Sequence, residues 1–259
     1  MSAAVAASVE EHYQFNEVVG KGSFSVVRMG VKRTSRELVA IKCIDKTSLN
    51  TAEELAIPQR EIRALRRLPR HPNAVFLLDS YETDSHVFLV FELARKGTLA
   101  DWLHRQPLGL SELEAKQVVG QLALAIDHVH SHGIVHVDVT PRNVFIDDGG
   151  VVKLGDFGFA VSDARDMAGM RGSMNYASPE LRCGEQFDEA TDVWSLGVLT
   201  YETLTGVAPF SGGQEELRMP DSLWADKSPE ARAFVVCLLT RDKALRPTMK
   251  QVLKLGWLL

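Results

Sequence analysis

Apolar residues alternate with polar ones in the first part of the chain, and glycines interrupt the alternation. From Phe15 to Ile44 this pattern is rich in β-branched residues and broken by a polar turn at 34–37, which predicts an antiparallel meander of short strands. Residues 52–68 switch to helical spacing and predict an amphipathic helix. Two further strands are expected near 75–78 and 86–91.

The pattern changes after Gly97. A long amphipathic helix is predicted over Leu113–His130, with Gly133 as its C-terminal cap. Two short strands around an Asp-Asp-Gly-Gly turn predict a hairpin at 144–154. From Asp188 onward the chain is expected to be mainly helical.

These patterns predict an α+β fold in two lobes. The first is a small antiparallel β lobe with one main helix, and the second is larger and mainly helical. We divide the chain into a flexible N-terminal arm (1–14), the small lobe (15–95) and the large lobe (96–259).

Composition narrows the classes of protein. The 259 residues carry 29 Lys and Arg against 34 Asp and Glu, and a net charge of -5 gives no field suited to a nucleic-acid partner. No stretch reaches the about 20 apolar residues of a membrane span, and the start lacks a signal peptide's basic region. Cys43, Cys183 and Cys237 lack paired spacing and predict buried thiols. We therefore expect a cytoplasmic protein, with the nucleus as the other compartment.

A glycine-rich segment, Gly20-Lys21-Gly22-Ser23-Phe24-Ser25, lies between two predicted strands. Its small residues let backbone N–H groups approach a polyphosphate. Ser25 replaces the third glycine of a dinucleotide fingerprint and no helix follows, so neither that motif nor a Walker loop is present. An ordinary glycine-containing hairpin is the alternative interpretation.

Lys42 stands among apolar neighbours in a predicted strand. A buried ammonium group needs a partner, and the following helix offers Glu53, Glu54 and Glu61. Glu61 shares a helix face with the apolar Leu65 and is the candidate. Alternatively, the lysine extends to solvent from an edge strand.

Three polar residues follow in order after the long helix. Asp138 and Asn143 are five residues apart, and Asp156 comes after the hairpin. Their oxygen atoms are ligands that Mg²⁺ accepts, and Asp138 is also suited to orienting a hydroxyl nucleophile. Each alone is compatible with a polar turn. Together and in this order they indicate a site.

The ordered motifs resemble those of the eukaryotic-type protein kinase domain. Besides the segments above, Ala177-Ser178-Pro179-Glu180 stands where that family has Ala-Pro-Glu. Residues 192–197 resemble the anchoring helix of its large lobe, and Arg246 is expected to pair with Glu180. The resemblance covers about 15–257.

The resemblance implies an ATP- and Mg²⁺-dependent kinase of protein substrates. It implies that Lys42, held by Glu61, contacts the phosphates and that Asp138 orients the acceptor hydroxyl. Asn143 and Asp156 are the implied Mg²⁺ ligands. The implied ATP site is formed by Val19, Gly20, Lys21, Gly22, Ser23, Phe24, Ser25, Val27, Ala40, Lys42, Phe91, Glu92, Ala94, Phe145 and Asp156. The resemblance also places His136 in the core beneath Phe157, with Leu65 and Leu77.

The sequence departs from the family at three positions. Val137 replaces the arginine of His-Arg-Asp, so activation through the usual phosphate salt bridge is not expected. Thr140 replaces a lysine that contacts the transferred phosphate, and Arg142 is a candidate catalytic cation in its place, or a solvated loop residue. Ser25 replaces a loop glycine.

Gly172-Ser173-Met174-Asn175-Tyr176 resembles the segment of serine/threonine kinases, so Ser/Thr hydroxyls are the expected acceptors. Basophilic kinases tend to carry an acidic residue where Arg142 stands, so arginine-flanked substrates are not expected. A pseudokinase acting as a nucleotide-binding scaffold or allosteric partner is the alternative, supported by Val137, Thr140 and an abbreviated large lobe. A kinase of small molecules is a third, weaker interpretation. Regulation is expected from separate protein partners, if any.

Overall fold

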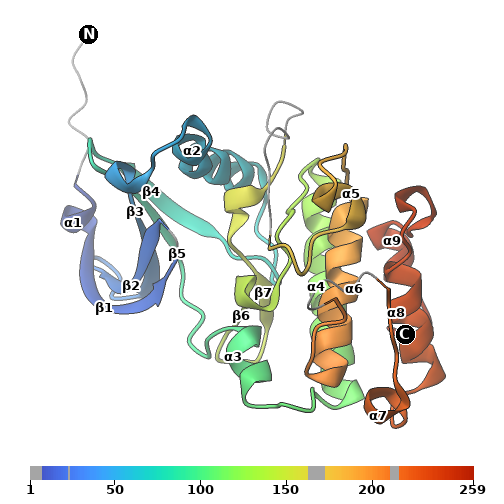
Figure 1. Cartoon of the computed structure of the whole chain (residues 1–259). Helices are drawn as coiled ribbons and strands as arrows, with labels where there is room; N and C mark the ends of the chain where they lie inside the picture. Colours follow the sequence, from blue (N-terminus) through green and yellow to red (C-terminus); the bar gives the residue numbers. More distant parts are fainter. Residues whose placement is uncertain (1–7, 23, 163–172, 211–215) are drawn as a thin grey trace.

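The computed structural model describes residues 8–22, 24–162, 173–210 and 216–259. A small lobe built on a sheet lies beside a larger helical lobe, with the short strands β6 and β7 where the two meet (Figure 1). The predicted α+β class and two-lobed architecture are therefore confirmed.

The small lobe is a five-stranded antiparallel sheet in the order β1-β2-β3-β5-β4. Its strands are β1 (Tyr13–Lys21), β2 (Ser25–Lys32), β3 (Leu38–Asp45), β4 (Leu77–Glu82) and β5 (His86–Glu92). The predicted meander is confirmed, but β4 begins later than expected. Residues before it bond to the large lobe instead, where the Val75 N–H donates to the Leu154 carbonyl at 2.9 Å.

The main helix of the small lobe is α2 (Ala52–Arg67), which lies across from the sheet in Figure 1. A capping box starts it, because Thr51 accepts from the Glu54 N–H while the Glu54 carboxylate accepts from the Thr51 N–H. Its buried face carries Glu61 together with apolar residues. The predicted helix is confirmed.

The expected flexible arm does not extend to residue 14. Val9–His12 form the short helix α1, and β1 starts at Tyr13. Val9 is 4% exposed and Tyr13 is fully buried, in an apolar cluster with Val39, Ile41 and Val90. The Tyr13 hydroxyl donates to Asp79 of β4. Apolar burial therefore fixes this segment on the sheet.

The large lobe is built around α4 (Glu112–Ser131), α6 (Ala190–Thr205) and α8 (Pro229–Leu238), which stand side by side in Figure 1. Shorter elements complete it: α3 (Leu99–His104), β6 (Val144–Ile146), β7 (Val152–Leu154), α5 (Pro179–Arg182), α7 (Asp221–Trp224) and α9 (Met249–Val252). The φ of Gly133 is +66°, just past the end of α4, as expected of a terminating glycine. The predicted long helix and hairpin are confirmed.

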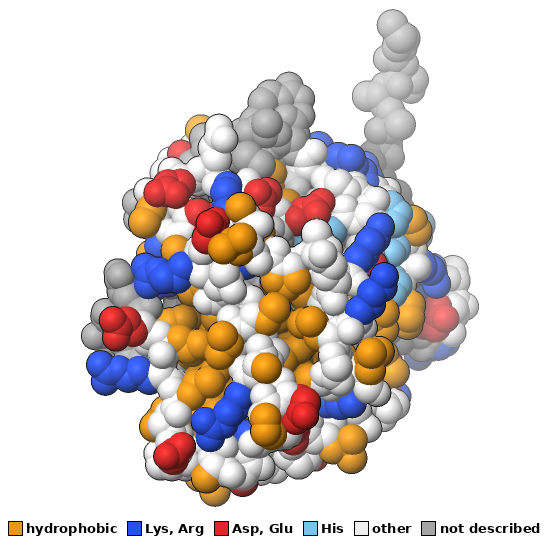
Figure 2. Space-filling view, turned by 90° about the vertical axis from the view of Figure 1, so that its right-hand side faces the viewer, with side chains coloured by type: hydrophobic (Ala, Val, Ile, Leu, Met, Phe, Trp, Pro, Cys, Tyr) orange, Lys and Arg blue, Asp and Glu red, His pale blue; other side chains and the backbone are white. Residues whose placement is uncertain are grey.

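The core of the large lobe is aromatic as well as aliphatic. Trp194, Trp224 and Trp257 are at most 5% exposed and pack within one cluster. Figure 2 views the side of this lobe that carries α8 and α9, where apolar side chains gather among charged ones. The three cysteines are unpaired; the expected burial is wrong for Cys183, which is exposed, and only partial for Cys43 and Cys237, which are half-buried.

Candidate active site

Lys42 of β3 reaches across to α2 and to the segment after β7. Its Nζ lies 3.0 and 2.9 Å from the two carboxylate oxygens of Glu61, and 2.8 Å from Oδ1 of Asp156. Glu61 is 1% exposed, whereas the Asp156 carboxylate is 44% exposed. The predicted pairing of Lys42 with Glu61 is therefore confirmed, and Asp156 is brought to the same ammonium group.

Charge and burial oppose each other in this trio. Burial disfavours the ammonium form of Lys42, but Asp156 and then Glu61 outweigh it and raise the Lys42 pKa above its ordinary value. Burial also raises the pKa of Glu61. The Lys42 charge lowers the pKa of Asp156. At neutral pH the site therefore holds the Lys42 ammonium group and the ionised carboxylate of Asp156.

Asp138 and Asn143 form a second group in the large lobe, around the 3-10 turn Pro141–Asn143. The Asn143 amide donates to the Asp138 backbone carbonyl at 2.8 Å and to its Oδ2 at 2.7 Å. The Ser173 N–H donates to Oδ1 of Asp138 at 2.8 Å. Both side chains are 8% exposed. Two hydrogen bonds, one to each carboxylate oxygen, therefore fix the direction in which the Asp138 carboxylate points.

The backbone before Asp138 adopts a rare conformation. Val137 has φ +71°, in the left-handed region that a β-branched residue seldom occupies. Its N–H donates to Oδ1 of the fully buried Asp192 at 2.8 Å, and the His136 N–H donates to Oδ2 at 2.8 Å. Burial opposes the charge of Asp192, but its hydrogen bond with His130 keeps the Asp192 pKa below the ordinary value. Asp192 thus anchors the loop that carries Asp138.

Where the resemblance implies an arginine, Val137 is 2% exposed in an apolar cluster. The cluster also contains Val135, Val161, Ala177, Leu181 and Phe187. Apolar packing thus occupies the place of the ion pair that the resemblance would lead one to expect. Thr140, at the position of the implied lysine, is also buried.

The segment after β7 is held by an aromatic contact. Asp156 has φ +56°, and its side chain accepts from the Gly158 N–H. Phe157 is fully buried, and its ring meets the His136 imidazole edge-on at a centroid distance of 4.7 Å. Leu65 and Leu77 pack in the same cluster as Phe157. The predicted position of His136 in the core beneath Phe157 is confirmed, although the rings meet edge-on and are not stacked, and this contact links α2 to the loop of Asp138.

Sheet register places several predicted ATP-site residues on one face. Lys42 pairs directly with Val27 of β2, and Ala40 pairs with Phe91 of β5. Opposite residues in an antiparallel pair share a face, and so do residues two apart in one strand. Val27, Ala40, Lys42 and Phe91 therefore share the face from which Lys42 reaches Glu61.

Three further predicted ATP-site residues, Phe145, Glu92 and Ala94, lie in β6, at the end of β5 and in the segment after it. Phe145 of β6 lies against Gly155, since a Cβ on Gly155 would come 2.8 Å from the Phe145 ring. The Glu92 carboxylate turns elsewhere, to the Phe76 N–H at 3.1 Å and to Lys153 at 3.1 Å. Ala94 follows β5 in the segment that joins the lobes.

The glycine-rich segment turns between β1 and β2. Gly20 and Lys21 pair with Val27 and Val26, and the Gly22 N–H donates to the Ser25 carbonyl at 2.8 Å. Phe24 is partly buried against the cluster of Ile44, Leu49 and Ile62. Val19 is 51% exposed on β1. Ser23 lies outside the described residues.

The arrangement of a lysine–glutamate pair, a hydrogen-bonded aspartate and an asparagine between two lobes agrees with the result of a family comparison. The chain matches the family model described as "Protein kinase domain" over residues 13–258. It belongs to the protein kinase family. The implied family membership is confirmed.

Several kinases are similar to this domain. A calcium/calmodulin-dependent protein kinase type 1 of Macrobrachium nipponense is 34% identical, over 97% of this chain and 76% of that protein. The type 1B enzyme of Rattus norvegicus is 35% identical, over 95% of this chain and 75% of that protein. A phosphorylase b kinase gamma catalytic chain, liver/testis isoform, of Rattus norvegicus is 32% identical, over 97% and 67% respectively.

The kinase domain also contains the predicted pair of Glu180 and Arg246. Two parallel hydrogen bonds of 2.6 and 2.7 Å join the guanidinium to the carboxylate. The other Arg246 N–H groups donate to the backbone carbonyls of Thr240, Ala190 and Arg241. All donors of this buried guanidinium are therefore used. This pair fixes α5 to the end of the large lobe.

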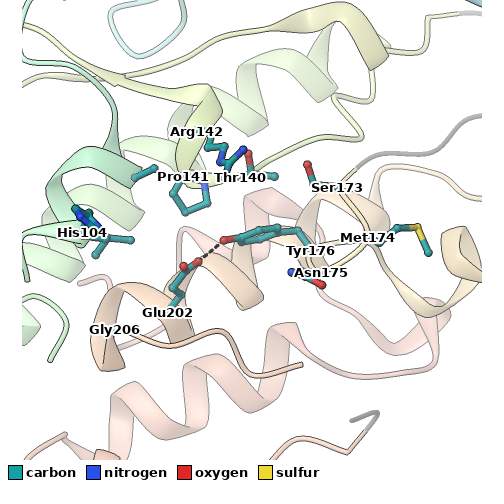
Figure 3. A pocket seen from close by; sticks show the side chains of 12 residues that line it. His104, Thr140, Pro141, Arg142, Ser173, Met174, Asn175, Tyr176, Glu202 and Gly206 are labelled. Carbon is teal, nitrogen blue, oxygen red and sulfur yellow. Dashed lines mark hydrogen bonds between the residues drawn. The ribbon is translucent and has the colours of Figure 1, made fainter. Parts of the chain in front are cut away.

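A pocket of about 600 Å³ lies next to the Asp138 loop and was not predicted (Figure 3). Arg142, exposed on the loop, lines it together with His104 of α3 and Glu202 of α6. The Tyr176 hydroxyl donates to Glu202 across its floor. Sequence reasoning missed His104 and Glu202 because no motif marks them. The one available signal for Glu202 was its position ten residues after Asp192, in the same helix α6.

Within the described ranges, no helix has the length and apolar character to cross a membrane. The same part of the chain holds no group of three or more His, Cys, Asp and Glu side chains arranged for a metal ion.

Proposed function

We propose that this kinase domain is an active enzyme that transfers the γ-phosphoryl group of ATP, with Mg²⁺, to Ser or Thr hydroxyls of proteins. The observation that supports this most is the joining of Lys42 to both Glu61 and Asp156, beside a fixed Asp138–Asn143 pair. The four groups that phosphoryl transfer most needs are Lys42, Asp138, Asn143 and Asp156.

Lys42 supplies the fixed positive charge for the nucleotide phosphates. Glu61 holds Lys42 from the buried side, so the ammonium group keeps its position when the exposed Asp156 turns to another ligand. The glycine-rich segment, whose small residues let a polyphosphate approach the backbone, is expected to cover the phosphates. These groups position the phosphates and neutralise their charge.

The donor set fits Mg²⁺. Asp156 presents an exposed carboxylate, and Asn143 uses its amide nitrogen for Asp138, which leaves its carbonyl oxygen for a cation. Oxygen ligands of this kind, completed by phosphates, are those that Mg²⁺ takes. When bound, the cation neutralises charge on the phosphates.

Asp138 acts on the acceptor. Its carboxylate is directed by Asn143 and by the Ser173 N–H, and in this role it orients the hydroxyl and takes its proton. Ser173 connects this group to the segment that resembles serine/threonine kinases, which supports Ser/Thr acceptors. The names of the similar proteins, calcium/calmodulin-dependent protein kinases and a phosphorylase b kinase chain, also favour protein substrates.

The adenine is expected between Val27 and Ala40 on one side and Phe145 on the other. Phe91 shares the face of Val27 and Ala40 and narrows the space behind the base. The backbone of residues 92–94 is expected to bond the purine edge.

A nucleotide-binding scaffold without transfer activity is the second candidate. The buried Thr140 favours it, because no cation stands at that position to contact the transferred phosphate. Arg142, two positions further along the loop, is the candidate cation for that charge in an active enzyme.

The two candidates are separated by measuring transfer and binding together. Purified protein is incubated with Mg²⁺, γ-labelled ATP and a generic protein substrate, beside the Asp138→Asn variant. An active enzyme labels the substrate, and the variant loses the labelling but keeps the rise in Tm that ATP causes. A rise in Tm without labelling by either protein would favour the scaffold.

A further inference from the structure

The pocket beside the Asp138 loop is where a substrate would place the side chains next to its acceptor residue. Its walls come from α3, from the loop residues Thr140 and Arg142, and from residues 173–176 (Figure 3). The Ser173 N–H in that wall bonds Asp138 at 2.8 Å. An extended chain advances about 3.3–3.6 Å per residue, so a side chain one to three residues from a hydroxyl at Asp138 falls within the pocket's reach.

The available charge in the pocket is positive. Arg142 is exposed and forms no ion pair with any residue that the structure describes. His104, on the neighbouring wall, is likewise exposed. Within the described part of the chain no hydrogen bond or ion pair occupies the Arg142 guanidinium, whose donors are therefore available to an incoming group.

The carboxylate on the pocket floor is already engaged. Glu202 is partly buried in α6 and accepts the Tyr176 hydroxyl. Burial raises the Glu202 pKa, and the hydrogen bond from Tyr176 partly opposes this shift. An incoming cation would have to pass Arg142 and displace this contact.

Resting on the proposed function, we propose that this pocket selects substrates with an acidic side chain near the acceptor hydroxyl, and that Arg142 is the residue that determines this preference. The guanidinium fork is suited to a carboxylate or phosphate, and it opposes a cationic side chain by like charge. Arg142 thereby acts on the substrate peptide.

The test compares serine peptides that carry Glu, Gln or Arg at each position from three before to three after the acceptor. For one position or more, kcat/KM for the Glu peptide is expected to exceed that for the Gln peptide about fivefold. Arg142→Glu should reverse this ratio in favour of the Arg peptide. Lys250→Glu, an equal change of net charge in α9, should keep it.

Binding is measured in parallel by fluorescence anisotropy, with the acceptor serine replaced by alanine. The affinities of these peptides show the preference for acidic or basic side chains even if no phosphate is transferred. A lack of transfer to every serine peptide would count against the proposed function alone. A wild-type preference for Arg peptides would overturn the inference and assign the pocket to Glu202. Loss of kcat in equal proportion on all peptides by Arg142→Glu, with the ratio kept, would also overturn it.

Discussion

The left-handed backbone of Val137 makes a sharp prediction about stability. Val137→Ala removes two methyl groups from a buried cluster, which costs about 1.6 kcal/mol by transfer alone and more with the cavity. Val137→Gly removes the Cβ as well. However, an L-residue with a Cβ pays about 1–2 kcal/mol in this region of φ/ψ space, and glycine does not.

Glycine should therefore be about as good a small residue as alanine at 137. Its greater loss of chain entropy costs about 0.5–1 kcal/mol and the lost burial of the Cβ costs about 0.8 kcal/mol, which together about equal the strain that glycine relieves. The hydrogen bond to Asp192 is kept by both variants, because its donor is the backbone N–H. We expect Val137→Gly and Val137→Ala to agree in free energy of unfolding to within about 1 kcal/mol.

Val161 provides the matched control, since it lies in the same buried cluster but not at a positive φ. There no strain is relieved, so Val161→Gly should be less stable than Val161→Ala by about 1.3–1.8 kcal/mol. Urea unfolding at equal m-values measures all four variants. An advantage of alanine over glycine that is as large at 137 as at 161 would refute the conformation assigned to Val137.

Two further predictions concern stability. Arg246→Met should lower the free energy of unfolding by about 3–5 kcal/mol, because it leaves the buried Glu180 carboxylate without its partner. Urea unfolding measures this change, and a loss below about 1 kcal/mol would contradict the prediction. Burial, His128 and Lys153 lower the pKa of His71 in the folded state, so the folded protein binds fewer protons there than the unfolded one. The stability that His71 contributes should therefore fall as the pH drops below the unfolded pKa of about 6.5, and unfolding of His71→Gln at pH 7.5 and 5.5 should show a weaker dependence on pH than the wild type.

Much of the site was predictable from local pattern and motif order. Glu61 was identified as the partner of Lys42 because it shares a helix face with Leu65, and the structure joins the two at 2.9 Å. The pairing of Glu180 with Arg246 came from the resemblance and is confirmed. Both pairs were predictable because each residue lies in a recognisable sequence pattern, a helix face for Glu61 and family motifs for Glu180 and Arg246.

Features that depend on contacts distant in sequence were missed. The burial of Val9 and Tyr13 arises from packing on β3 and β5, which the alanine-rich start of the chain does not indicate. The pairing of Tyr176 with Glu202 spans two elements and follows no periodicity. The conformation of Val137 is imposed by Asp192, 55 residues away, against the local preference of valine.

The most direct measurement is a crystal structure with Mg²⁺ and a non-hydrolysable ATP analogue. We expect Lys42 to contact phosphate oxygens while it keeps Glu61, and Asn143 and Asp156 to coordinate the cation, with Asp138 facing the terminal phosphate. Saturating nucleotide that leaves the cleft empty, or that binds with Lys42 still joined to Asp156 and no phosphate near it, would contradict the proposed kinase site.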